Sequence, residues 1–201
     1  MGVSITRLWH NRQIFRSAMA CLLRRLGGDE TALMSGGLSA YETEGLVSWL
    51  PECGVFVEFG TLFGFTARAV ANAKPGLKVI AVDDFSWNPF GLTPDQHEDF
   101  TRRVLAKEIA DGRIELVRMS SADFRSKVSS GERTVPDAVF FDDLHQYGPI
   151  REELVWAKEF HVKMISGHDY GNPSPRFGVT RAVDEVFGAD SFKVMGMCWC
   201  V

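Results

Sequence analysis

The stretch Val55-Phe-Val-Glu-Phe-Gly-Thr-Leu-Phe-Gly64 decides the fold class of this chain, because it passes from a strand through a glycine turn into a helix. Its first three residues are apolar and predict a buried strand that ends at Glu58. Gly60 and Gly64 allow the backbone to turn sharply and to approach a ligand closely. The helix that begins near Phe65 offers unpaired N–H groups to an anion. This order is typical of the ligand-binding turn of an open α/β sheet.

Strands and helices alternate along the rest of the chain. Apolar runs predict strands at residues 55–57, 78–82, 114–117, 137–141, 163–166, 192–195 and 197–201. Helical spacing predicts helices at residues 39–50, 66–73, 94–110, 122–128, 150–160 and 179–187, the first with a capping box of Ser39 and Glu42. The alternation predicts a Rossmann-like α/β fold: a seven-stranded, mostly parallel sheet with one antiparallel edge strand and helices on both faces.

Composition is that of a folded domain of 201 residues, with 45% hydrophobic and 24% charged residues. The net charge of -4 argues against nucleic acid as a partner, because phosphate binding needs a basic face. No apolar run approaches the ~20 residues that cross a bilayer. The four cysteines match no zinc spacing, and we interpret them as reduced thiols of a cytoplasmic protein.

The first 28 residues form a separate segment that contains five arginines and no acidic residue. We predict a basic amphipathic helix at residues 1–28, followed by the main domain at residues 29–201. The helix could pack on the domain or on a second copy in a homo-oligomer. The alternative is peripheral contact with an anionic membrane surface.

Acidic and histidine side chains follow several predicted strands where each strand ends: Glu58, Asp83, Asp142, and His168 with Asp169. Ligands of open α/β sheets bind at this edge. A carboxylate at Asp83 suits the hydroxyls of a ribose. A dinucleotide turn has the pattern GxGxxG, whereas this turn has only GxxxG, and the charge of Glu58 suits a ligand with an ammonium group. S-adenosylmethionine (SAM), with a cationic sulfur and an amino-acid tail, is therefore the expected cofactor.

Three later segments strengthen this interpretation. Phe140-Phe-Asp-Asp-Leu-His-Gln-Tyr147, Ile165-Ser-Gly-His-Asp-Tyr170 and Gly178-Val-Thr-Arg-Ala-Val-Asp-Glu185 occur in this order. Together with Val57–Gly64, they resemble motifs of the class I SAM-dependent methyltransferases. The closest branch is the small family of sugar and small-molecule O-methyltransferases that includes macrolide-sugar enzymes. The chain departs from that pattern at Asp143, where the family usually has glycine, and at Leu144.

The resemblance implies roles for particular residues. The cofactor would contact Glu58, Gly60, Thr61, Gly64, Asp83, Ser121 and Asp142. His145 would take the proton of a sugar or phenol-like acceptor, next to Asp142. In metal-dependent relatives the positions of Asp142, His168 and Asp169 hold Mg²⁺.

Other roles for these residues stay open. His168 fits the oxygen preference of magnesium poorly and could instead orient Asp142. His145 could form hydrogen bonds within its own loop. Asp143 is expected to be a solvated loop residue, and His97 and His161 are expected at the surface.

Two other functions also stay open. An NAD-dependent oxidoreductase can use a similar sheet, although the third glycine of its turn is missing. A non-catalytic SAM-binding or assembly protein could retain the fold without the reaction.

Overall fold

The computed structural model describes residues 38–87 and 92–201. Its strands are β1 (Cys53–Phe59), β2 (Gly76–Asp83), β3 (Ile114–Arg118), β4 (Ala138–Phe141), β5 (Met164–Gly167), β6 (Lys193–Met195) and β7 (Cys198–Cys200). Its helices are α3 (Ala40–Trp49), α4 (Phe65–Ala73), α5 (Pro94–Val104), α6 (Ala106–Ala110), α7 (Ser121–Ser129), α8 (Tyr147–Glu159) and α9 (Val179–Phe187). The basic helix predicted at residues 1–28 lies outside the described residues.

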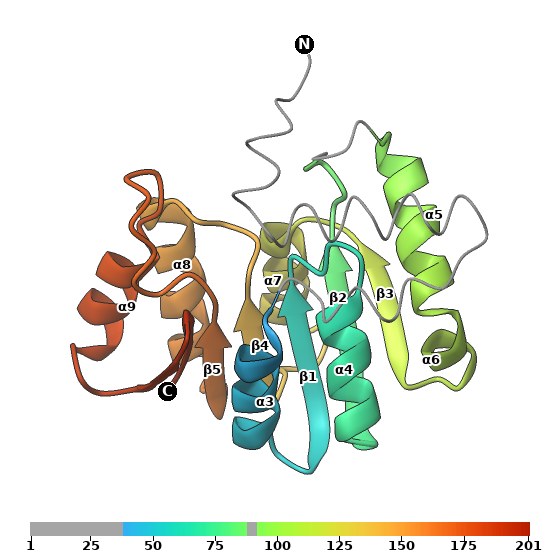
Figure 1. The fold of residues 1–201 in the computed structure, drawn as a ribbon, viewed down its shortest axis with the longest axis horizontal. Helices are drawn as coiled ribbons and strands as arrows, with labels where there is room; N and C mark the ends of the chain where they lie inside the picture. Colours follow the sequence, from blue (N-terminus) through green and yellow to red (C-terminus); the bar gives the residue numbers. More distant parts are fainter. Residues whose placement is uncertain (1–37, 88–91) are drawn as a thin grey trace.

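The seven strands form one sheet in the order β3-β2-β1-β4-β5-β7-β6. Strands β1 to β5 are parallel to their neighbours, and β7 runs antiparallel to both β5 and β6. The predicted α/β sheet is therefore confirmed, with the reversed strand one place in from the edge. The arrows of β1 to β5 point the same way in Figure 1, so their carboxyl ends form one edge.

Helices cover both faces of the sheet, as predicted (Figure 1). One apolar core contains Phe56 of β1 with side chains of α3, α4 and α5, such as Leu46 and Val70. The other contains the next strand residue, Val57, with side chains of α7, α8 and α9. Alternate residues of a strand point to opposite faces, so one continuous apolar strand serves both cores.

The helix predicted at residues 94–110 is two helices, and that part of the prediction is wrong. Thr93 and Gln96 cap the start of α5 with a capping box. Between α5 and α6, Leu105 has φ -95° and ψ 6°, and its side chain is fully buried. Gly64 leaves room for it, because a Cβ on Gly64 would lie only 2.7 Å from the Leu105 side chain. Tertiary packing therefore interrupts a sequence with helical spacing throughout.

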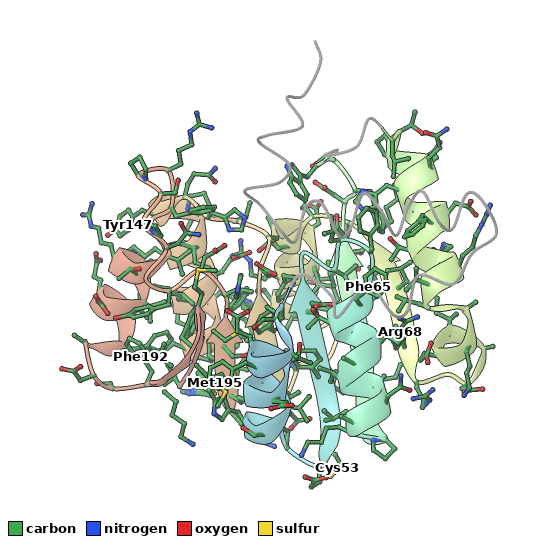
Figure 2. All side chains as sticks on the ribbon, viewed as in Figure 1. Cys53, Phe65, Arg68, Tyr147, Phe192 and Met195 are labelled. Atoms are coloured by element: carbon green, nitrogen blue, oxygen red, sulfur yellow. The ribbon has the colours of Figure 1, made fainter. Side chains whose placement is uncertain are left out.

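The described cysteines Cys53, Cys198 and Cys200 are free thiols, whereas Cys21 lies outside the described residues. Cys53 begins β1, at the end of the sheet away from Tyr147 (Figure 2). No helix within residues 38–87 and 92–201 combines the length and the hydropathy that crossing a bilayer requires.

Candidate functional site

The glycine turn after β1 packs directly on the backbone that follows β4. Gly60 and Gly64 have φ of +83° and +77°, a region that favours glycine. A Cβ on Gly60 would lie 2.6 Å from the carbonyl oxygen of Asp142. Close packing therefore favours glycine at these positions, which the sequence alone does not reveal. The contact of Gly60 places the turn beside Asp142.

Glu58 at the end of β1 supports this turn through a hydrogen bond. Its carboxyl group is buried and accepts a 2.6 Å hydrogen bond from the hydroxyl of Thr61. Burial, together with the charges of Asp142 and Asp83, raises the pKa of Glu58 to about 8. Two residues predicted to bind the cofactor thus contact each other, and Glu58 supports the turn.

Asp83 connects the end of β2 to the same turn. Its Oδ2 accepts a 2.8 Å hydrogen bond from the backbone N–H of Leu62, and its Oδ1 accepts one of 2.7 Å from Phe85. Burial raises the pKa of Asp83 to about 6, against the effect of these two donors. The carboxylate is therefore mostly ionised at neutral pH, which is compatible with its predicted role as an acceptor for ribose hydroxyls.

Two residues of α5, His97 and Thr101, support the turn from the other side. The Thr101 hydroxyl donates to the carbonyl oxygen of Leu62 at 2.7 Å, and Nε2 of His97 lies 3.1 Å from that oxygen. The prediction that His97 lies at the surface is wrong, because only 1% of it is exposed. Its spacing from the buried Phe100 and Val104 was the available signal, since such residues share one face of a helix.

Ser121 begins α7 and lies beside two buried carboxyl groups, those of Asp143 and Glu153. The prediction of a solvated Asp143 is wrong: its Oδ1 is buried without a hydrogen bond, and burial raises its pKa. The cause is the packing of the turn after β4 against α7 and α8. Glu153 is fully buried, and neither of its carboxyl oxygens has a hydrogen bond.

His145 and Asp169 form a pair across the ends of β4 and β5. Nδ1 of His145 lies 3.2 Å from Oδ2 of Asp169, and the ring edge packs on Phe177 at 4.5 Å between centroids. Asn172 donates a 2.7 Å hydrogen bond to the other oxygen of Asp169. Asp169 holds Nδ1, so Nε2 is the ring nitrogen that can receive a proton. The side chain is 33% exposed, which leaves it within reach of a ligand.

His168 lies deeper, between carboxylates from three directions. Its Nε2 is 3.3 Å from Oε1 of Glu42, and its Nδ1 is 3.5 Å from Oδ1 of Asp142 and 3.7 Å from Oδ1 of Asp169. Burial alone would lower the pKa of His168. The charge of Asp142 and the hydrogen bonds to Asp142 and Glu42 overcome that effect and raise the pKa to about 10. The surrounding carboxylates therefore favour the charged form of the ring.

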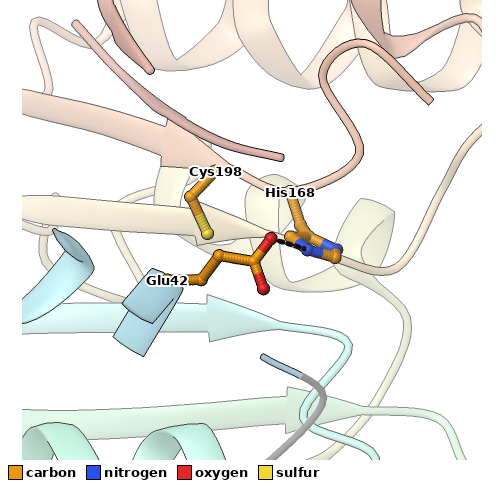
Figure 3. Close-up of side chains that lie close together, drawn as sticks. All are labelled: Glu42, His168 and Cys198. Carbon is orange, nitrogen blue, oxygen red and sulfur yellow. Dashed lines mark hydrogen bonds and ion pairs between the residues drawn. The ribbon is translucent and has the colours of Figure 1, made fainter. Parts of the chain in front are cut away.

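Glu42 belongs to the site, although its local sequence pattern indicates only a helix cap. The capping box with Ser39 is confirmed. The same carboxylate also accepts from the backbone N–H of Met197 at 2.9 Å and faces His168 (Figure 3). Because 126 residues separate Glu42 from His168, no local pattern could reveal this contact.

The predicted metal residues do not form one donor set. Asp142, His145 and Asp169 place ligand atoms within 4.8 Å of one another, whereas His168 groups with Glu42 and Cys198. Magnesium prefers oxygen ligands, and a ligating histidine must be neutral. The groups that face Asp142 and Asp169 are the ring nitrogens of His145 and His168, not a third carboxylate. These residues therefore do not fit Mg²⁺, and we derive no step through it.

Comparisons with known proteins agree with this architecture. No protein-family model matches the chain, and no curated protein matches it. Among solved structures, an O-methyltransferase from Bacillus cereus in complex with S-adenosylhomocysteine (SAH) has a TM-score of 0.65 and 15% identity, covering 95% of this chain and 90% of that one.

Two further structures are similar. The O-methyltransferase TomG from Streptomyces achromogenes in complex with SAM has a TM-score of 0.60 and 15% identity over 92% of this chain and 87% of that one. CalS11, a TDP-rhamnose 3'-O-methyltransferase, has a TM-score of 0.57 and 20% identity over 80% and 75%. At these identities the similarity concerns architecture. The chain therefore has the fold of the class I SAM-dependent methyltransferases.

Proposed function

We propose that this protein is a SAM-dependent O-methyltransferase that methylates a hydroxyl group of a small polar acceptor. The observation that carries the proposal is the His145–Asp169 pair at the carboxyl edge of the sheet. Gly60 joins this edge to the glycine turn through its contact with Asp142. A turn suited to SAM and a histidine suited to proton transfer therefore lie next to each other, because the turn packs on the backbone that precedes His145.

The cofactor would lie across the ends of β1 and β2. Asp83 would accept hydrogen bonds from the ribose hydroxyls, using lone pairs that Leu62 and Phe85 leave. Thr61, Gly60 and Gly64 would supply the turn, and Ser121 would lie near the adenine. The charge of Asp142 suits the ammonium group of the amino-acid tail of SAM, because opposite charges attract strongly where water is scarce.

In the reaction the acceptor oxygen attacks the SAM methyl carbon; the carbon–oxygen bond forms as the carbon–sulfur bond breaks, which leaves neutral sulfur in SAH. Nε2 of His145 takes the hydroxyl proton, and Asp169 stabilises the imidazolium that results. A positioned general base of this kind contributes about 10²–10⁴ in rate. Holding the oxygen in line with the methyl group contributes more.

The acceptor class is a sugar or phenol-like hydroxyl. One structural neighbour, CalS11, is a TDP-rhamnose 3'-O-methyltransferase, so a sugar nucleotide belongs in the first set of acceptors tested. Transfer of a labelled methyl group from SAM to sugar nucleotides and catechols would identify the class.

Calorimetry with SAH tests the cofactor half. Wild type should bind, and Asp83→Asn should bind about 10-fold to 100-fold more weakly, because a hydrogen bond to a charged acceptor contributes ~1.5–3 kcal/mol. Asp84→Asn is the matched control, since this neighbouring side chain is exposed and accepts a hydrogen bond from the backbone N–H of Ser86. Absence of SAH binding by wild type, or equal binding by Asp83→Asn, would contradict the proposal. Binding of NADH in place of SAH would favour the oxidoreductase.

His145→Asn tests the catalytic half. The asparagine amide can still donate to Asp169 in place of Nδ1, but it has no counterpart of Nε2. We expect kcat to fall by about 10²–10⁴ with SAH affinity unchanged. His161→Asn, at an exposed histidine, should leave both unchanged. Equal activity of His145→Asn and wild type would exclude His145 as the base.

A further inference from the structure

We propose that His168 is a resident cation of this site, held by Glu42, which takes the place of a divalent metal between Asp142 and Asp169. The inference rests on the proposed function, because it concerns the carboxylates that serve that reaction. It predicts methyl transfer without a metal ion.

The ring of His168 is surrounded by hydrogen-bond acceptors. Carboxylate oxygens face both nitrogens of His168: Glu42 at Nε2, and Asp142 and Asp169 at Nδ1. An ionised carboxylate only accepts hydrogen bonds, so a ring nitrogen without hydrogen would meet an oxygen lone pair. Both nitrogens therefore carry hydrogen, and a ring with two N–H groups is a cation.

Glu42 is held in place as an ionised partner of His168. Its Oε2 accepts from the backbone N–H and the hydroxyl of Ser39, at 2.9 and 2.7 Å, and its Oε1 accepts from Met197. Gly196 makes this approach possible, because a Cβ there would lie 2.6 Å from Oε1. The donors on both oxygens leave no place for a proton on Glu42, so its charge persists in the interior.

Cys198 offers an alternative that the surroundings exclude. It lies near Glu42 and His168 (Figure 3), and together the three residues could hold a metal ion. A metal would need a thiolate and a neutral imidazole. Ser39 and Met197 already donate to the oxygens of Glu42, and the buried thiol of Cys198 lies beside that carboxylate, which disfavours a thiolate there. These three residues therefore suit a protonated His168 and not a bound metal ion.

The consequence for the reaction is a division of roles. A magnesium ion would neutralise Asp142 and Asp169 and also polarise the acceptor oxygen as a Lewis acid. His168 is 6% exposed, so it can offset part of the negative charge and orient the carboxylates but cannot reach the acceptor. Activation of the acceptor then depends on His145, which Asp169 positions. Glu42 and His168 are positioning residues in this scheme.

Two measurements on wild type test the charge and the metal. In the ring ¹⁵N–¹H spectrum at pH 7, with His168→Gln for assignment, His168 should show two N–H signals. Titration of Mn²⁺ into the SAH complex should show no site tighter than ~1 mM. EDTA should change neither the thermal midpoint nor methyl transfer. A single N–H signal, or one Mn²⁺ bound more tightly than ~1 mM, would overturn the inference.

A double variant, Glu42→Gln with His168→Asp, tests whether the cation can be exchanged. It replaces the imidazolium by a third carboxylate, and we expect one Mn²⁺ to bind at least ~10-fold more tightly than to wild type. His161→Asp adds a carboxylate at an exposed site and should not do so. A folded double variant that binds no Mn²⁺ would also count against the inference. If it does not fold, the spectrum and titration of wild type decide.

His168→Gln separates positioning from simple stability. The amide can donate to Glu42 but has no counterpart of Nδ1. We expect kcat to fall about 10-fold to 100-fold with the KM for SAM unchanged. Equal losses in SAH affinity and kcat would overturn the positioning role. If wild type binds no SAH, the proposed function fails, while the ring spectrum still reports on His168 separately.

Discussion

Glu42 and Glu153 are both buried glutamates on helices that cover opposite faces of the sheet, yet their surroundings favour opposite charge states. Glu42 on α3 accepts hydrogen bonds at both oxygens and faces a charged histidine. Glu153 on α8 has no hydrogen bond at either oxygen, and the nearest cation, Nε of Arg125, is 3.9 Å away. Hydrogen bonds, led by that of His168, hold the pKa of Glu42 well below its usual range despite burial. Burial raises the pKa of Glu153 well above it.

The comparison shows that burial alone does not decide the charge of a carboxyl group. Burial disfavours the charged form, and donors aimed at the oxygens favour it. Glu42 is ionised because the start of its helix, the turn before β7 and the end of β5 all supply donors. Glu153 has no hydrogen bond at either oxygen, and burial therefore raises its pKa. Only an ionised carboxylate can hold a cation beside it, which favours the proposed role of Glu42 beside His168.

Glu42→Ala should have the largest effect on stability. It leaves His168 a buried charge without its partner and removes the acceptor for Ser39 and Met197. Breaking a buried pair in this way costs about 3–5 kcal/mol in the free energy of unfolding. Urea unfolding would measure this cost, with Glu44→Ala on the exposed face of α3 as the control. A loss below ~1 kcal/mol would mean that Glu42 is not a buried ionised partner.

Glu58 should show the next largest effect, because it lies between the two extremes with one hydroxyl donor, Thr61. Its pKa in the folded protein, about 8, is above its ordinary value of 4.5. Its contribution to stability is therefore complete below pH 4.5 and is lost as the pH rises through 8. Wild type should lose about 2–3 kcal/mol between pH 6 and pH 9 relative to Glu58→Gln. Parallel pH profiles of the two proteins in urea unfolding would contradict this expectation.

Glu153→Gln should change the free energy of unfolding by less than ~1 kcal/mol at pH 7, because an amide replaces a carboxyl group whose charged form burial disfavours. Thermal and urea unfolding at pH 7 would measure the difference. The matched comparison is Glu42→Gln, where the same substitution removes a charge and should cost more. A loss above ~2 kcal/mol for Glu153→Gln would indicate that Glu153 is ionised and paired with Arg125.

An exposed pair should show the smallest effect. Lys127 and Glu132 lie 2.8 Å apart, with side chains 41% and 60% exposed. Water screens such pairs, so Lys127→Ala should cost only ~0.2–1 kcal/mol. Added salt should reduce that cost, whereas it should leave the cost of Glu42→Ala nearly unchanged. A loss of several kcal/mol for Lys127→Ala would mean that exposure to water does not explain the difference between the Lys127–Glu132 pair and the buried Glu42–His168 pair.

Much of the fold could be predicted from the sequence, because it depends on local patterns. The strand that ends at Glu58, the capping box at Ser39 and the helix dipole pattern of α5 are all visible within a few residues. The break at Leu105 was not predictable, because it depends on the space above Gly64, which is distant in the sequence. Local patterns do not report on packing between such distant elements.

The candidate site likewise contains residues that local patterns predict and residues that they do not. Strand ends located Asp83, Asp142 and Asp169, since the carboxyl ends of parallel strands meet at one edge. The burial of His97 and Asp143 depends on which helix covers which turn, and the sequence alone led to a wrong prediction of exposure for both. The role assigned to His168 as a ligand came from the resemblance, whereas its surroundings depend on Glu42.

The hydrogen bond from Met197 to Glu42 also sets the order in which the site is completed. It joins residues 155 positions apart, so a chain growing on the ribosome exposes Glu42 long before its partner exists. At ~5–20 residues per second, that interval is roughly 8–30 s. During it the residues of β1 to β5 are synthesised, while Glu42 lacks the donor that Met197 supplies. The contacts that hold Glu42 beside His168 can therefore be completed only after Met197 has been synthesised.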